Sequence, residues 1–158
     1  MLYGFGVALS VRGGARPVDA GPPRQNVDGF MGRLSVLYVD DEPDLRDVAA
    51  MSLELDTDIE VQVAGNGPEA LRLLADGACT PGVILLDVTM PEMDGPSVLA
   101  RLRQTDQYAT TPVIFVTARV QRQEIELFKS LGAIGVISKP YDPLKLAATV
   151  RSIMDAAA

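Results

Sequence analysis

The chain has 158 residues, of which 47% are hydrophobic, enough for one domain with a substantial core but with no run near the roughly 20 apolar residues of a membrane helix. It contains no histidine, which excludes a Ser-His-Asp triad, a Cys-His pair and any histidine-ligated metal site, and its one cysteine excludes an internal disulfide and fits a reducing, cytoplasmic compartment. The net charge is −7, and residues 34–158 alone carry ten basic and nineteen acidic residues, so we expect this part of the chain not to bind nucleic acid.

Residues 1–33 differ from the rest of the chain in composition. They hold seven glycines and three prolines, a content associated with disorder. We expect a disordered or mis-annotated extension, with Met31 as the true start, because the first apolar strand begins three residues later. Residues 34–158 are then expected to form one domain.

From Leu34 onwards, short apolar runs alternate with segments of helical spacing. In the first helical segment the apolar positions Leu45, Val48, Ala49 and Leu53 follow a helical period, with Ser52 on the same face. The expected strands cover residues 34–39, 59–64, 82–86, 112–116 and 133–138, and the expected helices cover about 43–55, 68–76, 96–104, 121–132 and 143–154.

This alternation predicts an α/β fold. Five strand–helix units with short links favour a doubly wound, five-stranded parallel sheet with right-handed crossovers and helices on both faces. The third strand, GVILL, is apolar throughout, as expected of a strand that is covered on both sides. Ligands of such sheets bind beyond the carboxyl ends of the strands.

An acidic segment, DDEPD, follows the first strand. Its four carboxylates would repel the phosphate that a glycine-rich loop at this place would bind. Helix capping is an alternative role for aspartate here. Pro43 suits the first helical turn and places the cap at Glu42, which leaves Asp40 and Asp41 for cation binding.

Three further polar residues follow later strands: Asp87, Thr117 and Lys139. Each has an ordinary alternative role, as a turn residue, a strand or cap residue and a surface lysine, respectively. Because parallel strands end at one edge of the sheet, we expect these residues to join Asp40 and Asp41 in one acidic pocket. Carboxylates without histidine or cysteine favour Mg²⁺ over Zn²⁺, and the lysine suits a phosphoryl group.

In their order and spacing, these motifs resemble the receiver domain of two-component response regulators. The matching features are the Asp40-Asp41 pair, Asp87 with the segment MPEMDG, Thr117-Ala118, and Lys139-Pro140. The resemblance implies a flavodoxin-like sheet of strand order 2-1-3-4-5. It also implies that Asp87 accepts a phosphoryl group from a phosphohistidine on a histidine kinase or a histidine phosphotransfer protein.

The resemblance also implies a role for each site residue. Asp41 and Asp87 would ligate Mg²⁺, with Asp40 helping directly or through water and the Thr89 carbonyl supplying another oxygen. Lys139 would pair with one phosphoryl oxygen and Thr117 would donate a hydrogen bond to another. The Lys139–Pro140 peptide bond is often cis in this family.

A domain of this kind catalyses only its own phosphorylation and dephosphorylation, so we expect no other enzyme activity. About nineteen residues follow Lys139, room for one helix, so we expect no output domain and a readout through an unknown downstream protein target. We expect a monomer or weak dimer with no membrane contact.

One feature sets the chain apart from many receivers, and two alternative functions remain to be weighed. Val136 stands where an aromatic switch residue is usual, three residues before Lys139, and Tyr141 is not an obvious substitute. A phosphatase of the haloacid-dehalogenase type is one alternative, but it needs a second aspartate where Thr89 stands. A pseudo-receiver is another, but it usually lacks the acidic pair or the acceptor, and both are intact here.

Overall fold

The computed structural model of the protein describes residues 32–158. We expect residues 1–33 to be a disordered or mis-annotated extension, with Met31 as the true start of the protein. The structure describes only the last two of these residues, so this expectation lies outside the described part of the chain.

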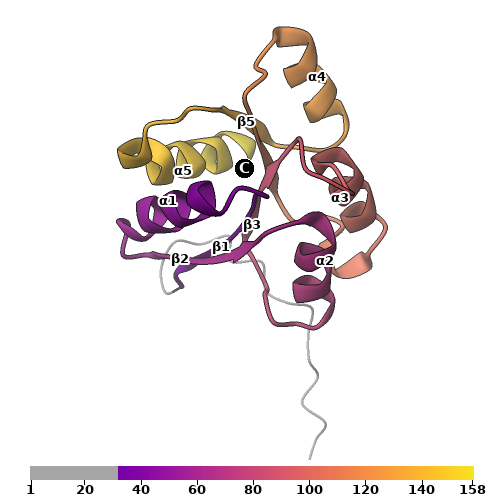
Figure 1. Cartoon of the computed structure of the whole chain (residues 1–158), viewed down its shortest axis with the longest axis horizontal. Helices are drawn as coiled ribbons and strands as arrows, with labels where there is room; N and C mark the ends of the chain where they lie inside the picture. The colour runs from indigo at the N-terminus through magenta and orange to yellow at the C-terminus, as the bar shows by residue number, and fades with distance from the viewer. Residues whose placement is uncertain (1–31) are drawn as a thin grey trace, which may run out of the picture.

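The described chain contains one five-stranded parallel sheet of order β2-β1-β3-β4-β5 (Figure 1). The order agrees with the flavodoxin-like arrangement that the resemblance implied. The strands are β1 Leu34–Val39, β2 Ile59–Ala64, β3 Val83–Asp87, β4 Val113–Thr117 and β5 Gly135–Ser138.

Helices cover both faces of this sheet, as the alternating pattern predicted. Helices α1 and α5 lie on one face, and α2, α3 and α4 lie on the other (Figure 1). The helices are α1 Pro43–Glu54, α2 Gly67–Ala75, α3 Gly95–Arg103, α4 Arg122–Ser130 and α5 Leu146–Ala157, with short 3₁₀ turns η1 Asp106–Tyr108 and η2 Pro143–Lys145. No helix among the described residues is both long and apolar enough to cross a membrane.

The central strand β3 separates two hydrophobic cores. Its side chains alternate, so that Val83 and Leu85 pack with α1 and α5 while Ile84 and Leu86 pack with α2, α3 and α4. Every residue of β3 is buried. A strand held on both faces gives its last residue, Asp87, a fixed position at the sheet edge.

The structure corrects several expected boundaries. The segment expected to be one helix over 143–154 begins as the 3₁₀ turn η2, where Asp142 accepts a hydrogen bond from Leu144 N, and α5 proper then runs to Ala157. The last strand starts at Gly135 rather than at residue 133, and Gly132, with φ of 109°, lies in the turn that precedes it. The remaining elements agree with the expected ones to within one residue, except that α4 ends two residues earlier than expected, at Ser130.

One residue of the first helix was placed wrongly. Val48 was assigned to the buried face, but 40% of it is exposed, and the buried residues of α1 are Ala49, Ser52 and Leu53. Val48 instead lines a shallow apolar groove next to Tyr141 and Pro143. The helix therefore presents a narrower stripe to the sheet than its sequence pattern suggests.

Candidate functional site

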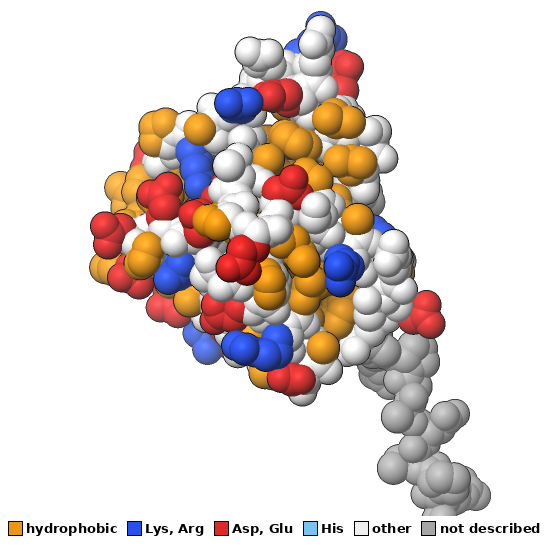
Figure 2. All heavy atoms as spheres, turned by 45° about the vertical axis from the view of Figure 1, so that its right-hand side comes forward, with side chains coloured by type: hydrophobic (Ala, Val, Ile, Leu, Met, Phe, Trp, Pro, Cys, Tyr) orange, Lys and Arg blue, Asp and Glu red, His pale blue; other side chains and the backbone are white. Residues whose placement is uncertain are grey.

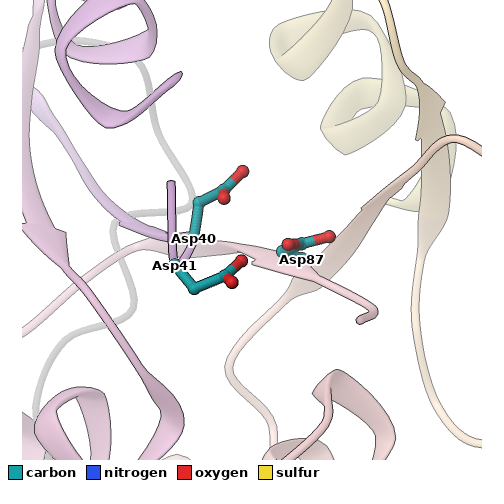
Figure 3. Close-up of side chains that lie close together, drawn as sticks. All are labelled: Asp40, Asp41 and Asp87. Atoms are coloured by element: carbon teal, nitrogen blue, oxygen red, sulfur yellow. The ribbon is translucent and has the colours of Figure 1, made fainter. Parts of the chain in front are cut away.

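Three aspartates gather at the carboxyl edge of the sheet (Figure 3). Asp40 and Asp41 follow β1, and Asp87 ends β3, which is the neighbouring strand. One carboxylate oxygen from each lies within 4.8 Å of the others. The expected convergence of the strand ends is therefore observed, whereas the role of each residue as a ligand stays a prediction.

Asp40 is the most firmly held of the three. It is fully buried, and its Oδ2 accepts hydrogen bonds from Lys139 Nζ at 2.7 Å and from the Tyr38 hydroxyl at 3.2 Å. Its Oδ1 accepts from Glu42 N at 3.0 Å, and its carbonyl accepts from the Arg46 guanidinium at 2.7 Å. Both carboxylate oxygens of Asp40 are thus fixed by donors of the chain itself.

Lys139 lies between two of the aspartates rather than facing all three equally. Its Nζ is 2.7 Å from Asp40 Oδ2 and 3.4 Å from Asp87 Oδ1, and no ion pair with Asp41 is found among the described residues. Burial acts to lower the pKa of Lys139, but its hydrogen bond and charge interaction with Asp40, and then those with Asp87, outweigh burial and raise this pKa. Lys139 therefore stays charged in the site.

The pKa of Asp87 is raised to about 6, first by burial of its carboxylate and then by the negative charge of Asp40. Lys139 and a backbone hydrogen bond from Thr89 act in the opposite direction. Loss of solvent therefore contributes more to the raised pKa of Asp87 than repulsion by the neighbouring carboxylate does. Asp87 is only 7% exposed.

The loop after Asp87 is held by close packing. A Cβ atom on Gly95 would lie 2.5 Å from the Asp87 carbonyl oxygen and 3.0 Å from the Phe115 ring, so this position needs glycine. Gly95 N donates to Val88 O at 2.9 Å, and Asp94 caps α3 by accepting from Ser97 N at 2.8 Å. This loop therefore returns directly onto Asp87 and Val88.

Thr117 and Lys139 are positioned by β4 and β5. Thr117 is buried at the end of β4, and its Oγ1 accepts from Arg119 N at 3.1 Å, which leaves the hydroxyl proton available to donate. Lys139 N donates to Thr117 O at 2.8 Å, and the Lys139–Pro140 bond is cis, as the resemblance implied. Thr89 and Arg119, which follow Asp87 and Thr117 by two residues, are both exposed. The role of the Thr89 carbonyl as a metal ligand stays a prediction.

The donor set fits a hard divalent cation. Three carboxylates face one lysine, so the cluster carries more negative than positive charge. Mg²⁺ prefers such oxygen ligands and commonly binds through one or two carboxylates and water. Asp41, which is partly exposed and without an ion pair to Lys139, and Asp87 are the residues best placed to hold it.

Two residues of the site were missed from the sequence. Arg46 and Tyr38 both bond to Asp40. Tyr38 carried a signal: it lies two residues before Asp40 in a strand, so both face the same side, and a buried tyrosine hydroxyl needs a partner. No sequence signal indicated Arg46, because its hydrogen bond to the Asp40 carbonyl depends on the direction in which α1 leaves the loop.

A protein-family comparison identifies this arrangement. The model of the response regulator receiver domain matches residues 36–151, which include all the site residues above. The chain belongs to this family. It is accordingly a receiver domain of the two-component response regulator type, with the flavodoxin-like fold described above.

Curated relatives agree with this assignment. The receiver is similar to response regulator Rre1 of Synechocystis, at 35% identity over 121 residues that cover 77% of this chain and 52% of Rre1. It is also similar to TrcR, a transcriptional regulatory protein of Mycobacterium tuberculosis, at 33% identity, covering 84% of this chain and 52% of TrcR. The chain thus spans about half the length of these relatives.

Solved structures show the same fold. The chemotaxis protein CheY4 of Vibrio cholerae is 31% identical and superposes with a TM-score of 0.69, over 77% of this chain and 99% of CheY4. The receiver domain of the Francisella response regulator 1452 is 28% identical, with a TM-score of 0.68, over 79% of this chain and 99% of that chain.

Proposed function

We propose that this receiver domain accepts a phosphoryl group on Asp87 from a phosphohistidine of a histidine kinase or a histidine phosphotransfer protein. The observation that carries the proposal is the placement of the Asp87 carboxylate, 3.4 Å from Lys139 Nζ and within 4.8 Å of the Asp40 and Asp41 oxygens. A nucleophilic carboxylate, a fixed ammonium and two further carboxylates are the groups that this transfer requires.

In the proposed reaction an Asp87 carboxylate oxygen attacks the phosphorus of the phosphohistidine. The new P–O bond forms as the P–N bond breaks, and the electron pair of the broken bond returns to the imidazole nitrogen of the partner. The imidazole takes up one proton from water, so the products are an acyl phosphate on Asp87 and a neutral histidine. Lys139 Nζ pairs with one phosphoryl oxygen and the Thr117 hydroxyl donates to another, which stabilises the charge of the transferring group.

Mg²⁺ is the proposed cofactor, held by Asp41 and Asp87, with Asp40 bound directly or through water and the Thr89 carbonyl as a further ligand. When bound, it would offset the charges of the carboxylates and of the phosphoryl oxygens. The excess of negative charge in the cluster supports this assignment. A cation at this place would also act against the raised pKa of Asp87 and favour its ionised, nucleophilic form.

The proposed receiver catalyses only its own phosphorylation and dephosphorylation. The phosphoryl group adds a charge of about −1.5 to −2, which changes the conformation of nearby loops. In the proposed function, a downstream protein binds to this changed surface. We place this exchange in the cytoplasm, where the buried, reduced Cys79 is stable, and propose a monomer or weak dimer that binds neither nucleic acid nor membrane.

The test is phosphorylation of the purified chain with Mg²⁺ and a small acyl-phosphate donor. We expect a mass gain of one phosphoryl group that is stable in acid and labile in base. Asp87→Asn and EDTA should each abolish the gain, whereas Asp106→Asn, which removes an exposed carboxylate from η1, should leave it unchanged.

Two outcomes would contradict the proposal. Steady turnover of phosphate monoesters without a stable adduct would indicate a phosphatase. Absence of any adduct with acyl phosphates and with a panel of phosphorylated histidine kinases would indicate a pseudo-receiver.

A further inference from the structure

Two tyrosine hydroxyls form a hydrogen-bonded chain that leads from Asp40 toward the surface. The Tyr38 hydroxyl lies 3.2 Å from Asp40 Oδ2 and 3.3 Å from the Tyr141 hydroxyl, and Tyr38 is buried. Asp40 is ion-paired with Lys139, so its carboxylate can only accept, and Tyr38 must donate to it. Tyr38 then has only lone pairs left for Tyr141, so the chain runs from Tyr141 to Tyr38 to Asp40.

We propose that Tyr38 is a positioning residue for phosphoryl transfer, which keeps Asp40 hydrogen-bonded while Lys139 moves to the phosphoryl group on Asp87. This inference rests on the function proposed above. It assigns to Tyr38 a role that acts through Asp40, because Tyr38 itself has no contact with Asp87 among the described hydrogen bonds.

The position of Lys139 creates the need for such a residue. Its Nζ lies closer to Asp40 Oδ2, at 2.7 Å, than to Asp87 Oδ1, at 3.4 Å. Pairing with a phosphoryl oxygen on Asp87 therefore draws Lys139 away from Asp40. Without a second donor, a fully buried carboxylate oxygen would lose its hydrogen bond, which is costly.

Tyr38 is the second donor to that oxygen. As Lys139 leaves, the Tyr38 hydroxyl keeps Oδ2 satisfied, so the energetic cost of the movement falls. This cost belongs to the transfer step and not to binding of the donor or of Mg²⁺. Loss of the Tyr38 hydroxyl should therefore lower the maximal rate and leave both affinities nearly unchanged.

Tyr141 extends the effect to a surface. It lines the apolar groove together with Leu45, Val48 and Pro143, and it packs with the core on the side of α1 and α5. Hydrogen bonds in a chain strengthen one another, so a stronger bond from Tyr38 to Asp40 also strengthens the bond from Tyr141 to Tyr38. Val136 packs with the core on the side of α2, α3 and α4. The hydrogen-bonded chain through Tyr141 therefore leads to the opposite side of the sheet from Val136.

The first test compares the rate of phosphorylation with the two affinities. In Tyr38→Phe we expect the maximal rate at saturating acyl phosphate and Mg²⁺ to fall about fivefold, the effect of losing one net hydrogen bond. The half-saturating donor concentration and the Mg²⁺ dissociation constant should change by less than about twofold. Neither ligand contacts the hydroxyl, and the two main proposed ligands of the ion, Asp41 and Asp87, do not bond to Tyr38. Tyr141→Phe should lower the rate by less than Tyr38→Phe does.

Tyr108→Phe is the matched control. Tyr108 is a buried tyrosine whose hydroxyl donates to Leu74 O at 2.7 Å, far along the chain from the acidic site. Its loss should lower the melting temperature without changing the rate. Equal rate losses in Tyr38→Phe and Tyr108→Phe, or an unchanged rate in Tyr38→Phe, would overturn the proposal.

The second test does not require phosphoryl transfer. Beryllium fluoride is a stable phosphoryl-like probe, and its addition with Mg²⁺ should shift the NMR signal of Tyr141 Cζ in the wild type and in Tyr108→Phe but not in Tyr38→Phe. The signal is assigned by its disappearance in Tyr141→Phe. A shift that persists in Tyr38→Phe refutes the hydroxyl chain. Failure of the wild type to gain a phosphoryl group instead refutes the proposed function and leaves this test intact.

Discussion

At the scale of single residues, two aspartates of the site differ in how many hydrogen bonds hold their carboxylates. Asp40 has its carboxylate oxygens bonded to Lys139, Tyr38 and the backbone of Glu42. Asp87 receives only the longer contact with Lys139 and a backbone hydrogen bond from Thr89. Asp87 is therefore the more weakly held carboxylate, which fits its proposed role as the phosphoryl acceptor.

This difference predicts a pH-dependent stability. Without metal, the pKa of folded Asp87 is about 6 and lies above its ordinary value of 3.8, so the folded state holds the proton more tightly. The stabilising effect of protonation is lost as the pH rises through about 6. In EDTA, Asp87→Asn should raise the free energy of unfolding at about pH 7.5 by on the order of 1–3 kcal/mol. At about pH 4.5 the gain should be about a third as large, because the carboxyl of the unfolded chain, with its ordinary pKa of 3.8, is already mostly ionised there.

Urea denaturation at the two pH values measures this effect, with Asp106→Asn as the control. Equal stability of Asp87→Asn and the wild type at both pH values would show that burial of the charged carboxylate carries no such cost.

Gly95 provides a second prediction at the residue scale. An added Cβ would lie 2.5 Å from the Asp87 carbonyl oxygen, so Gly95→Ala must displace the loop or the strand end. We expect a loss of about 1–3 kcal/mol in the free energy of unfolding, together with slower phosphorylation. Gly82→Ala is a suitable control, because its nearest contact is the flexible end of the Leu34 side chain, at 3.1 Å. Normal phosphorylation of Gly95→Ala would argue against tight coupling between this loop and Asp87.

At the scale of elements, an ion pair joins the end of α1 to α5. Asp56 follows α1, and its Oδ2 accepts a hydrogen bond from Arg151 Nε of α5 at 2.7 Å. This hydrogen bond is the main cause that lowers the pKa of Asp56, and a backbone hydrogen bond from Asp58 adds to it. Both side chains remain partly exposed, so water and salt weaken the interaction.

We expect a coupling of about 0.2–1 kcal/mol between Asp56 and Arg151 in a double-mutant cycle with Asp56→Asn and Arg151→Gln. Because the pKa of folded Asp56 is lowered, this stabilisation is fully present above its ordinary pKa of 3.8 and is lost as the pH falls through the folded value. Denaturation at neutral and acidic pH measures the coupling. A coupling that is independent of pH and of salt would contradict an electrostatic origin.

At the scale of the whole molecule, the acidic cluster lies where two neighbouring strands end beside each other. Figure 2 shows one face, on which Lys and Arg side chains are scattered among Asp and Glu rather than gathered in one basic patch. This pattern accords with the expectation that the described domain does not bind nucleic acid, which stays a prediction.

A cation bound in the folded state only should stabilise the whole molecule. At ten times its dissociation constant, Mg²⁺ should add about 1.4 kcal/mol to the free energy of unfolding and raise the melting temperature by a few degrees. EDTA should reverse the shift and Asp41→Asn should abolish it, whereas Asp106→Asn should retain it. An equal shift in Asp41→Asn and the wild type would place the cation elsewhere.

Much of this architecture could be predicted from local sequence. The apolar runs and the helical spacing identified all five strands and five helices, because each pattern reflects which faces are buried. The ends of β1, β3, β4 and β5 then indicated Asp40, Asp87, Thr117 and Lys139 as neighbours, because parallel strands finish at one edge. Residues at element ends were less accurate, as in the 3₁₀ turn at Pro143, because capping bonds compete locally with helix formation.

Other properties depended on contacts between distant parts of the chain. The bond between Lys139 and Asp40, the link from Tyr38 to Tyr141 and the exposure of Val48 all follow from how α1, β1 and the loop after β5 pack together. The cause of the raised pKa of Asp87 is likewise tertiary, because the burial of a carboxylate depends on everything that surrounds it. The sequence by itself determined which groups meet at the sheet edge, since the alternation of strands and helices indicates parallel strands that end at one edge. Only the tertiary structure decided which of them bond to one another, since hydrogen bonds are set by distances of a few tenths of an ångström.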